Sequence, residues 1–174
     1  STWPGGIPPE VAVVGDGPAG RSTTGEVTEV GQGVRVELRS SDPYRRWEQA
    51  SVIRGVAKGT VSAVAYAALG DITAEQFRAL AAIQRKLGAD VRLSNRQNVV
   101  FRNLQEDQLR ELYDALDAIG MARPGAELAR DVVACPGADT CNIAVTQSRG
   151  LAKAIGERLE EEGLAEVGGV RVNI

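Results

Sequence analysis

Residues 132–147, VVACPGADTCNIAVTQ, place the tightest constraint on how this chain can fold. They contain the only two cysteines among the 174 residues, Cys135 and Cys141. Six steps along a continuous helix turn through roughly 600°, so the two thiols of such a helix would point to different sides. Pro136 and Gly137 break a continuous helix here in any case. The pattern therefore predicts a short strand, a tight loop and then a new helix.

We expect the strand to cover residues 132–134 and to end at Cys135. Asp139 or Thr140 then caps a helix whose first turn contains Cys141. Both sulfurs then face one point beside a helix N-terminus, where backbone N–H groups and the helix dipole stabilise a thiolate. This arrangement predicts half of a site for a soft metal ion or a metal cluster.

Other interpretations of the cysteines stay open on spacing alone. Cysteines are often small buried hydrophobic residues, and C-x5-C is a weak pattern. A disulfide is disfavoured, because the charged chain without a signal peptide indicates a reducing compartment. A thiol-redox or metal-binding module that uses Cys135 and Cys141 alone is a further alternative, and a non-catalytic scaffold or binding domain is another.

The part of the chain before the cysteines shows alternating strand and helix patterns. The expected elements are two strands or one bent strand at 51–68, a helix at 73–87, strands at 90–94 and 98–103, and a helix at 105–119. Thr73 and Gln76 form a capping box at the start of the first helix, and Phe77 and Leu80 should pack inward. The order β-α-β-β-α is a split βαβ arrangement of ferredoxin-like type. Both helices then cover one sheet face, and the open face carries arginines.

The two ends of the chain have different patterns. Residues 1–50 are rich in glycine and proline and predict a turn-rich β connection. Their VAVVGDGPAG run matches G-x-G-x-x-G, but the RSTTGEVTEVGQG that follows has no helical apolar stripe to carry a pyrophosphate. After the cysteines, we expect a helix over residues 142–163 and a strand over residues 167–174. The acidic residues near the end of that helix, Glu160 among them, should be solvated surface charge.

Composition excludes several functions. The net charge of −3 gives no basic surface for nucleic acid. No apolar run reaches the length of a membrane span, and the first residues do not form a signal peptide, so we expect a cytoplasmic protein without a membrane span. The chain contains no histidine, which excludes histidine ligands and histidine-based acid–base catalysis within it.

Two segments together resemble the sirohaem-dependent nitrite and sulfite reductases. RDVVACPGADTCNIAVTQSRGLAKAI (130–155) is similar to the segment with that family's first cysteine pair, and GDITAEQFRALAAIQRKLGADVRLSNRQNVVFRNL (70–104) is similar to the ferredoxin-like half-domain before it. The resemblance runs from about Asp42 to the C-terminus. It implies an α+β fold with a ferredoxin-like half-domain over residues 51–129. Part of the α/β domain for sirohaem and a 4Fe–4S cluster follows over residues 130–174.

The same resemblance implies cofactor-binding residues. Cys135 and Cys141 would be two of the four thiolates that hold the 4Fe–4S cluster. The RLSNRQN run occupies the tetrapyrrole-contact motif of the family, which implies sirohaem contacts from Arg92, Arg96, Gln97 and Asn98. Bidentate guanidinium contacts suit the carboxylates of sirohaem. The alternative is that these arginines only solvate an exposed sheet face.

The resemblance also implies a reaction. Enzymes of this family reduce nitrite to ammonia or sulfite to sulfide by six electrons, which ferredoxin or a flavoprotein supplies through the cluster. No segment here matches the anion-binding residues of the family, so no catalytic residue is assigned in this chain. In the family the second cysteine pair follows a strand similar to VRVNI, the last five residues here. We therefore expect a fragment that works with the remainder of its parent chain and that by itself lacks both cofactors and activity.

Overall fold

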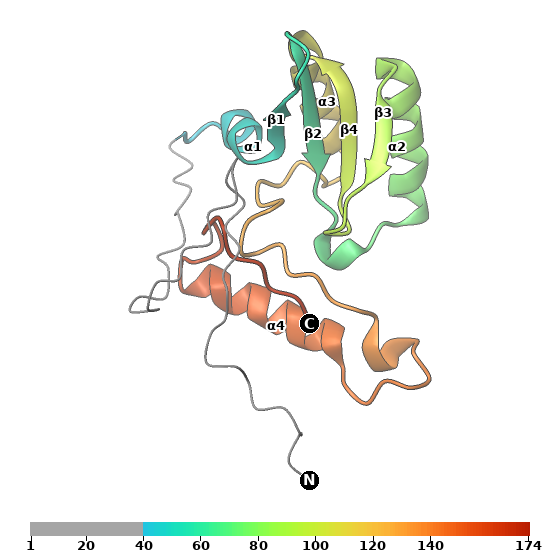
Figure 1. Ribbon diagram of the computed structural model, residues 1–174, viewed down its shortest axis with the longest axis vertical. Helices are drawn as coiled ribbons and strands as arrows, with labels where there is room; N and C mark the ends of the chain where they lie inside the picture. Colours follow the sequence, from blue (N-terminus) through green and yellow to red (C-terminus); the bar gives the residue numbers. More distant parts are fainter. Residues whose placement is uncertain (1–39) are drawn as a thin grey trace, which may run out of the picture. The chain divides into compact units, whose positions relative to one another are not determined.

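The structure is a computed structural model, and it describes residues 40–174. The G-x-G-x-x-G run lies outside the described residues. The regular elements in chain order (Figure 1) are α1 (Pro43–Ser51), β1 (Val52–Arg54), β2 (Thr60–Ala65), η1 (Ala68–Gly70), α2 (Ala74–Leu87), β3 (Asp90–Leu93), β4 (Val99–Gln105), η2 (Glu106–Gln108), α3 (Leu109–Asp117), η3 (Gly137–Asp139) and α4 (Ser148–Glu161).

Strands β1 to β4 form one antiparallel sheet with the order β1-β2-β4-β3 (Figure 1). In the central pair, Val61 lies opposite Leu104 and Ala63 lies opposite Phe101. One residue of β2 therefore faces two of β4, which is a β-bulge, and Asn103 within it has a φ of 58°. The bulge allows both Phe101 and Leu104 to reach the core.

The core lies between one sheet face and the helices α2 and α3. It is made by buried apolar side chains of the sheet and of both helices, chiefly Val61, Ala63, Val99, Phe101, Leu104, Leu80, Ile83, Leu109, Leu112 and Leu116. The predicted capping box is present, because Thr73 Oγ1 accepts from the Gln76 N–H at 3.2 Å and Gln76 Oε1 accepts from the Thr73 N–H at 2.9 Å. The inward position expected of Phe77 is wrong, since its side chain is 53% exposed. The α+β fold and the split βαβ order are confirmed.

Helix α1 was not expected from the sequence, which predicted a β connection there. Asp42 caps it by accepting from the Tyr44 N–H at 3.0 Å, and Pro43 occupies the first helical position, where a missing N–H costs nothing. The helix buries Trp47 completely against Tyr113, with ring centroids 5.4 Å apart. Residues 43–122, which we call the sheet region, therefore include α1 as part of the core.

Residues 123–174, the C-terminal region, contain less regular structure than expected. Among the described residues, the predicted strands reduce to isolated bridge positions, and the parallel bridge pairs Val133 with Asn173. The predicted helix begins at Ser148 rather than at residue 142, and Ile143 and Val145 before it are 91% and 96% exposed. A small second core of Val132, Ala134 and Ala152 joins α4 to the bridge.

Charged side chains connect these parts. Arg46 of α1 pairs with Glu166, and Arg149 of α4 pairs with Asp71, and both ion pairs are among those that link the sheet region to the C-terminal region. Glu160 is exposed, as expected for surface charge, and it also pairs with Arg123 and Arg130. Among residues 40–174, no helix combines the length and the apolar character needed to cross a membrane.

Candidate functional site

The two cysteines flank one 3-10 turn, η3. Cys135 is exposed, and its N–H donates to the Ile174 carbonyl at 3.1 Å, next to the parallel bridge. Cys141 is half-buried, and its N–H donates to the Gly137 carbonyl at 3.0 Å. Both thiols are free. The two cysteines therefore lie on either side of one short turn.

The position of the helix relative to the thiols differs from the prediction. Neither Asp139 nor Thr140 caps an α-helix, and Cys141 lies in irregular backbone seven residues before α4 begins. Thr140 has a φ of −140°, which ends the 3-10 turn instead of continuing it as a helix. The cysteine beside the α4 N-terminus is Cys135.

The thiol of Cys135 lies against the start of α4. Its Sγ is 3.2 Å from the Oγ of Ser148, which is the first residue of the helix and is buried. The hydrogen bond from the Ser148 hydroxyl lowers the pKa of the Cys135 thiol, and the backbone N–H groups of Gly137 and of Cys135 itself act in the same direction. Hydrogen bonds to a thiolate stabilise the charged form. Cys135 is therefore an exposed thiol whose pKa is lowered.

Gly137 keeps the loop and α4 close together. It has a φ of +59°, and a Cβ at this position would lie 2.3 Å from Ser148 Oγ and 2.7 Å from the Thr146 carbonyl oxygen. Both the backbone angle and the space thus require glycine. The cysteine loop depends on this residue for its contact with Ser148.

The donor set of the loop suits half of an iron–sulfur site. Iron–sulfur clusters are held by four cysteine thiolates, and this loop presents two, one of them with a lowered pKa. Within residues 40–174, no three His, Cys, Asp or Glu side chains gather in a metal-binding group. The two thiols fit one side of a cluster, and the other ligands are not among the described residues.

The four residues predicted to contact sirohaem occupy different environments. Arg92 on β3 is exposed, and its guanidinium donates to the neighbouring Val91 carbonyl at 2.9 Å. Arg96 and Asn98 are buried, with 4% and 0% exposure, and Gln97 is half-buried. These three side chains turn towards residues 128–134 of the C-terminal region.

Asp131 is the central partner of this turn. Its Oδ2 accepts from Asn98 Nδ2 at 2.7 Å and from the Glu127 N–H at 3.0 Å, and it lies 3.3 Å from Arg96 Nε. Burial raises the pKa of its carboxyl group, against the opposing hydrogen bonds from Glu127 and Asn98 and the charge of Arg96. The sequence analysis missed Asp131. Its position next to the apolar run VVA was the available signal, because a buried carboxylate at such a place needs a partner.

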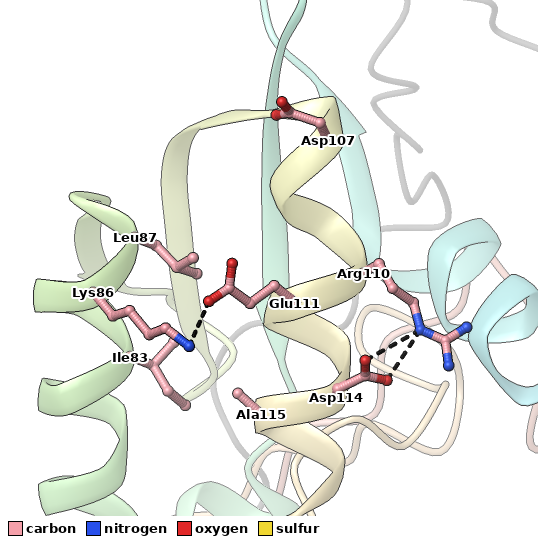
Figure 2. Close-up of a pocket in the computed structure, with 8 residues that line it drawn as sticks. All are labelled: Ile83, Lys86, Leu87, Asp107, Arg110, Glu111, Asp114 and Ala115. Atoms are coloured by element: carbon pink, nitrogen blue, oxygen red, sulfur yellow. Dashed lines mark hydrogen bonds and ion pairs between the residues drawn. The ribbon is translucent and has the colours of Figure 1, made fainter.

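A separate hollow of about 550 Å³ lies between α2 and α3 on the side of the helices away from the sheet (Figure 2). The ion pair between Lys86 and Glu111, at 2.6 Å, crosses it, and Arg110 pairs with Asp114 on its rim. It shares no residue with the cysteine loop or with the turn at Arg96. Four of its charged side chains pair with one another, Lys86 with Glu111 and Arg110 with Asp114, so we do not place the functional site there.

Comparison with known proteins supports the family suggested by the sequence. Residues 54–119 match the nitrite/sulfite reductase ferredoxin-like half domain. The similarity to nitrite and sulfite reductases therefore covers this half-domain of the chain. Over 81 residues it is 32% identical to the sulfite reductase [NADPH] hemoprotein beta-component of Methylobacterium radiotolerans, which covers 44% of this chain and 13% of that protein.

The structure of the Mycobacterium tuberculosis NirA protein is also similar. The TM-score is 0.54 with 26% sequence identity, and the alignment covers 71% of this chain and 24% of the NirA chain. The similarity therefore holds for the three-dimensional structure as well as for the sequence. The present chain spans a quarter or less of the length of these two proteins.

Proposed function

We propose that this chain is part of a reductase that converts nitrite to ammonia or sulfite to sulfide by six electrons. The proposal rests on the cysteine loop, which presents an exposed thiol of lowered pKa and a second thiol in a segment bonded to a half-domain of the reductase family. The two named relatives are a sulfite reductase haemoprotein and NirA.

We propose that Cys135 and Cys141 are two of the four ligands of a 4Fe–4S cluster. The Ile174 carbonyl accepts from the Cys135 N–H, so residue 174 lies next to the first thiol. In the family, a second cysteine pair follows a strand similar to VRVNI, and such a pair would begin beside Cys135. The cluster would supply electrons to the substrate site. The part of this chain is to hold two thiolates at fixed positions.

The sirohaem contacts are proposed for the turn that contains Arg92, Arg96, Gln97 and Asn98. Of these four side chains, Arg92 is the exposed one, and within residues 40–174 its guanidinium donates only to the adjacent Val91 carbonyl. It is the residue of this set that we expect to pair with a sirohaem carboxylate. Arg96 adds a buried positive charge, while its N–H groups are engaged with the C-terminal region.

The chain of 174 residues supplies two cysteines, so we expect it to hold neither a stoichiometric cluster nor sirohaem, and to lack reductase activity. Ferredoxin or a flavoprotein in the cytoplasm would deliver electrons to the whole enzyme. Iron and acid-labile sulfide analysis of the purified chain tests this expectation. Stoichiometric retention of both elements would refute it.

The decisive experiment uses the parent reductase. Its coding sequence should continue past residue 174 with a second cysteine pair, and the purified protein should consume nitrite or sulfite with reduced methyl viologen as donor. Cys135→Ser and Cys141→Ser should each abolish the visible absorption of the cluster and most of the bound iron. Thr140→Ser, a conservative change in the same loop, is the matched control. Unchanged absorption in the cysteine variants would remove the ligand assignment.

A thiol-redox module is the second candidate, because Cys135 is exposed and its pKa is lowered. Such a module should form a reversible disulfide between Cys135 and Cys141 in glutathione buffers. Mass spectrometry of alkylated protein measures this directly. A chain that forms no intramolecular disulfide across the accessible range of potentials excludes the candidate.

A further inference from the structure

Residues 94–98, which we call the docking turn, are bonded to the backbone that leads to the first cysteine. Arg96 donates to the carbonyls of Leu128 at 3.4 Å and Asp131 at 2.8 Å. Gln97 Nε2 donates to the Ala134 carbonyl at 3.2 Å, in the peptide unit directly before Cys135. The contacts thus follow the chain, step by step, to the candidate ligand.

Side-chain bonds within the protein interior reinforce this attachment. Asn98 donates to the Asp131 carboxylate at 2.7 Å, and its own Oδ1 accepts from the Ala67 N–H at 2.9 Å. Asn98, Arg96 and Asp131 are each 4% exposed or less. Within the described part of the chain, Arg96 Nε and Gln97 Oε1 are buried without a hydrogen-bond partner, whereas Asn98 and Asp131 are paired. The Asn98–Asp131 pair favours one geometry, because separating the two side chains leaves desolvated groups without partners.

The conformation of the docking turn is itself constrained. Gln97 has a φ of +65°, which a side chain other than that of glycine or asparagine rarely adopts. A Cβ at Gly70 would lie 2.9 Å from Gln97 Cβ, so η1 packs closely on the same side chain. The turn is held in an unfavourable backbone region by contacts on both sides, and its side chains are directed at the C-terminal region.

We propose that Arg96, Gln97 and Asn98 are positioning residues, which fix the location of Cys135 through Asp131 and the Ala134 carbonyl. The interpretation of Cys135 as a cluster ligand rests on the proposed function, whereas the positioning of its backbone does not. The motif that faces the tetrapyrrole in the resemblance would then also set where one cluster sulfur lies. The docking turn would then both contact sirohaem and fix the position of the cluster ligand Cys135.

An exchange of the two side chains tests the proposal in the 174-residue chain. Asn98→Asp places two carboxylates against each other at the position of a 2.7 Å hydrogen bond. Asn98→Asp combined with Asp131→Asn restores one donor and one acceptor with their roles reversed. Hydrogen exchange of the Val133 and Cys135 amides, which donate to Val172 and Ile174, is the measurement.

We expect Asn98→Asp to speed exchange of these two amides by about tenfold or more, the effect of a coupling near 1.4 kcal/mol, while β4 amides change little. The exchanged pair should return most of the protection. Leu112→Ala, which weakens the core without touching the turn, should instead loosen the sheet region. A merely structural role for Asn98 would behave like this control.

Gln97→Asn provides a second variant that keeps a residue tolerant of positive φ but is too short to reach the Ala134 carbonyl. It should loosen the Cys135 amide selectively. Equal loosening of β4 and of the Cys135 amide, or an exchanged pair no better protected than Asn98→Asp alone, would overturn the positioning role. Neither result bears on whether the parent enzyme binds a cluster, so the two proposals fail separately.

Discussion

Gly137→Ala offers a test of whether the cysteine loop is held as tightly as its contacts indicate. Alanine at a φ of +59° costs about 1–2 kcal/mol from backbone strain alone. The new Cβ would also lie 2.7 Å from the Thr146 carbonyl oxygen and 2.9 Å from the Ser148 nitrogen, both of which belong to the backbone. Overpacking of this kind adds about 1–3 kcal/mol. The total expected loss is therefore about 2–5 kcal/mol.

Gly88→Ala is the matched control for this variant. Gly88 ends α2 with a φ of +64°, and a Cβ there would meet nothing within 4 Å. It should lose only the backbone contribution of about 1–2 kcal/mol. Urea unfolding followed by circular dichroism gives both losses, and hydrogen exchange at Cys141, whose amide donates to the Gly137 carbonyl, gives the local effect. Equal losses in the two variants, with unchanged exchange at Cys141, would refute close packing of the loop on α4.

Three further outcomes are expected. Leu112→Ala should lower the free energy of unfolding by about 2–5 kcal/mol in urea titrations, because Leu112 is completely buried, and a loss below about 1 kcal/mol would contradict the core described here. Ser148→Ala should raise the pKa of Cys135 and move its iodoacetamide profile to higher pH, with the alkylation of Cys141 as internal reference; an unchanged profile would remove the hydroxyl as the cause. The folded-state pKa of Asp131 is raised above the ordinary 3.8. As the pH falls, the folded chain therefore takes up this proton at a higher pH than the unfolded chain does. Its stability relative to Asp131→Asn should therefore fall as the pH rises from 3.8 through the raised pKa, and a pH-independent difference would count against burial of the charge.

Local patterns identified most of the sheet region. The capping box at Thr73 and the alternation around Phe101 are properties of neighbouring residues, and the structure contains both features. Helix α1 had an equally local signal in Asp42 and Pro43, which the abundance of glycine and proline before them obscured. The prediction that Phe77 packs inward was wrong because α2 lies at the edge of the sheet. The apolar periodicity of a helix does not show where the helix lies on a sheet.

The candidate site was predicted less completely, because its contacts join distant residues. The spacing of Cys135 and Cys141 indicated a shared loop, but the helix beside Cys135 begins only at Ser148. Asn98 and Asp131 are 33 residues apart, and nothing in the RLSNRQN run indicates that its polar side chains are buried. Periodicity describes which face of an element is apolar, whereas a buried polar pair depends on which elements meet.

The ion pairs from Arg46 to Glu166 and from Arg149 to Asp71 have a consequence for how firmly the cysteines are held. Their side chains are 28–65% exposed, and added electrolyte shields charges at such positions, while it leaves apolar cores intact. The second core is smaller than the core of the sheet region, so ion pairs contribute a larger share of the contacts of the C-terminal region. The chain should consequently hold its thiols more loosely at high ionic strength than in dilute buffer, with the sheet unchanged.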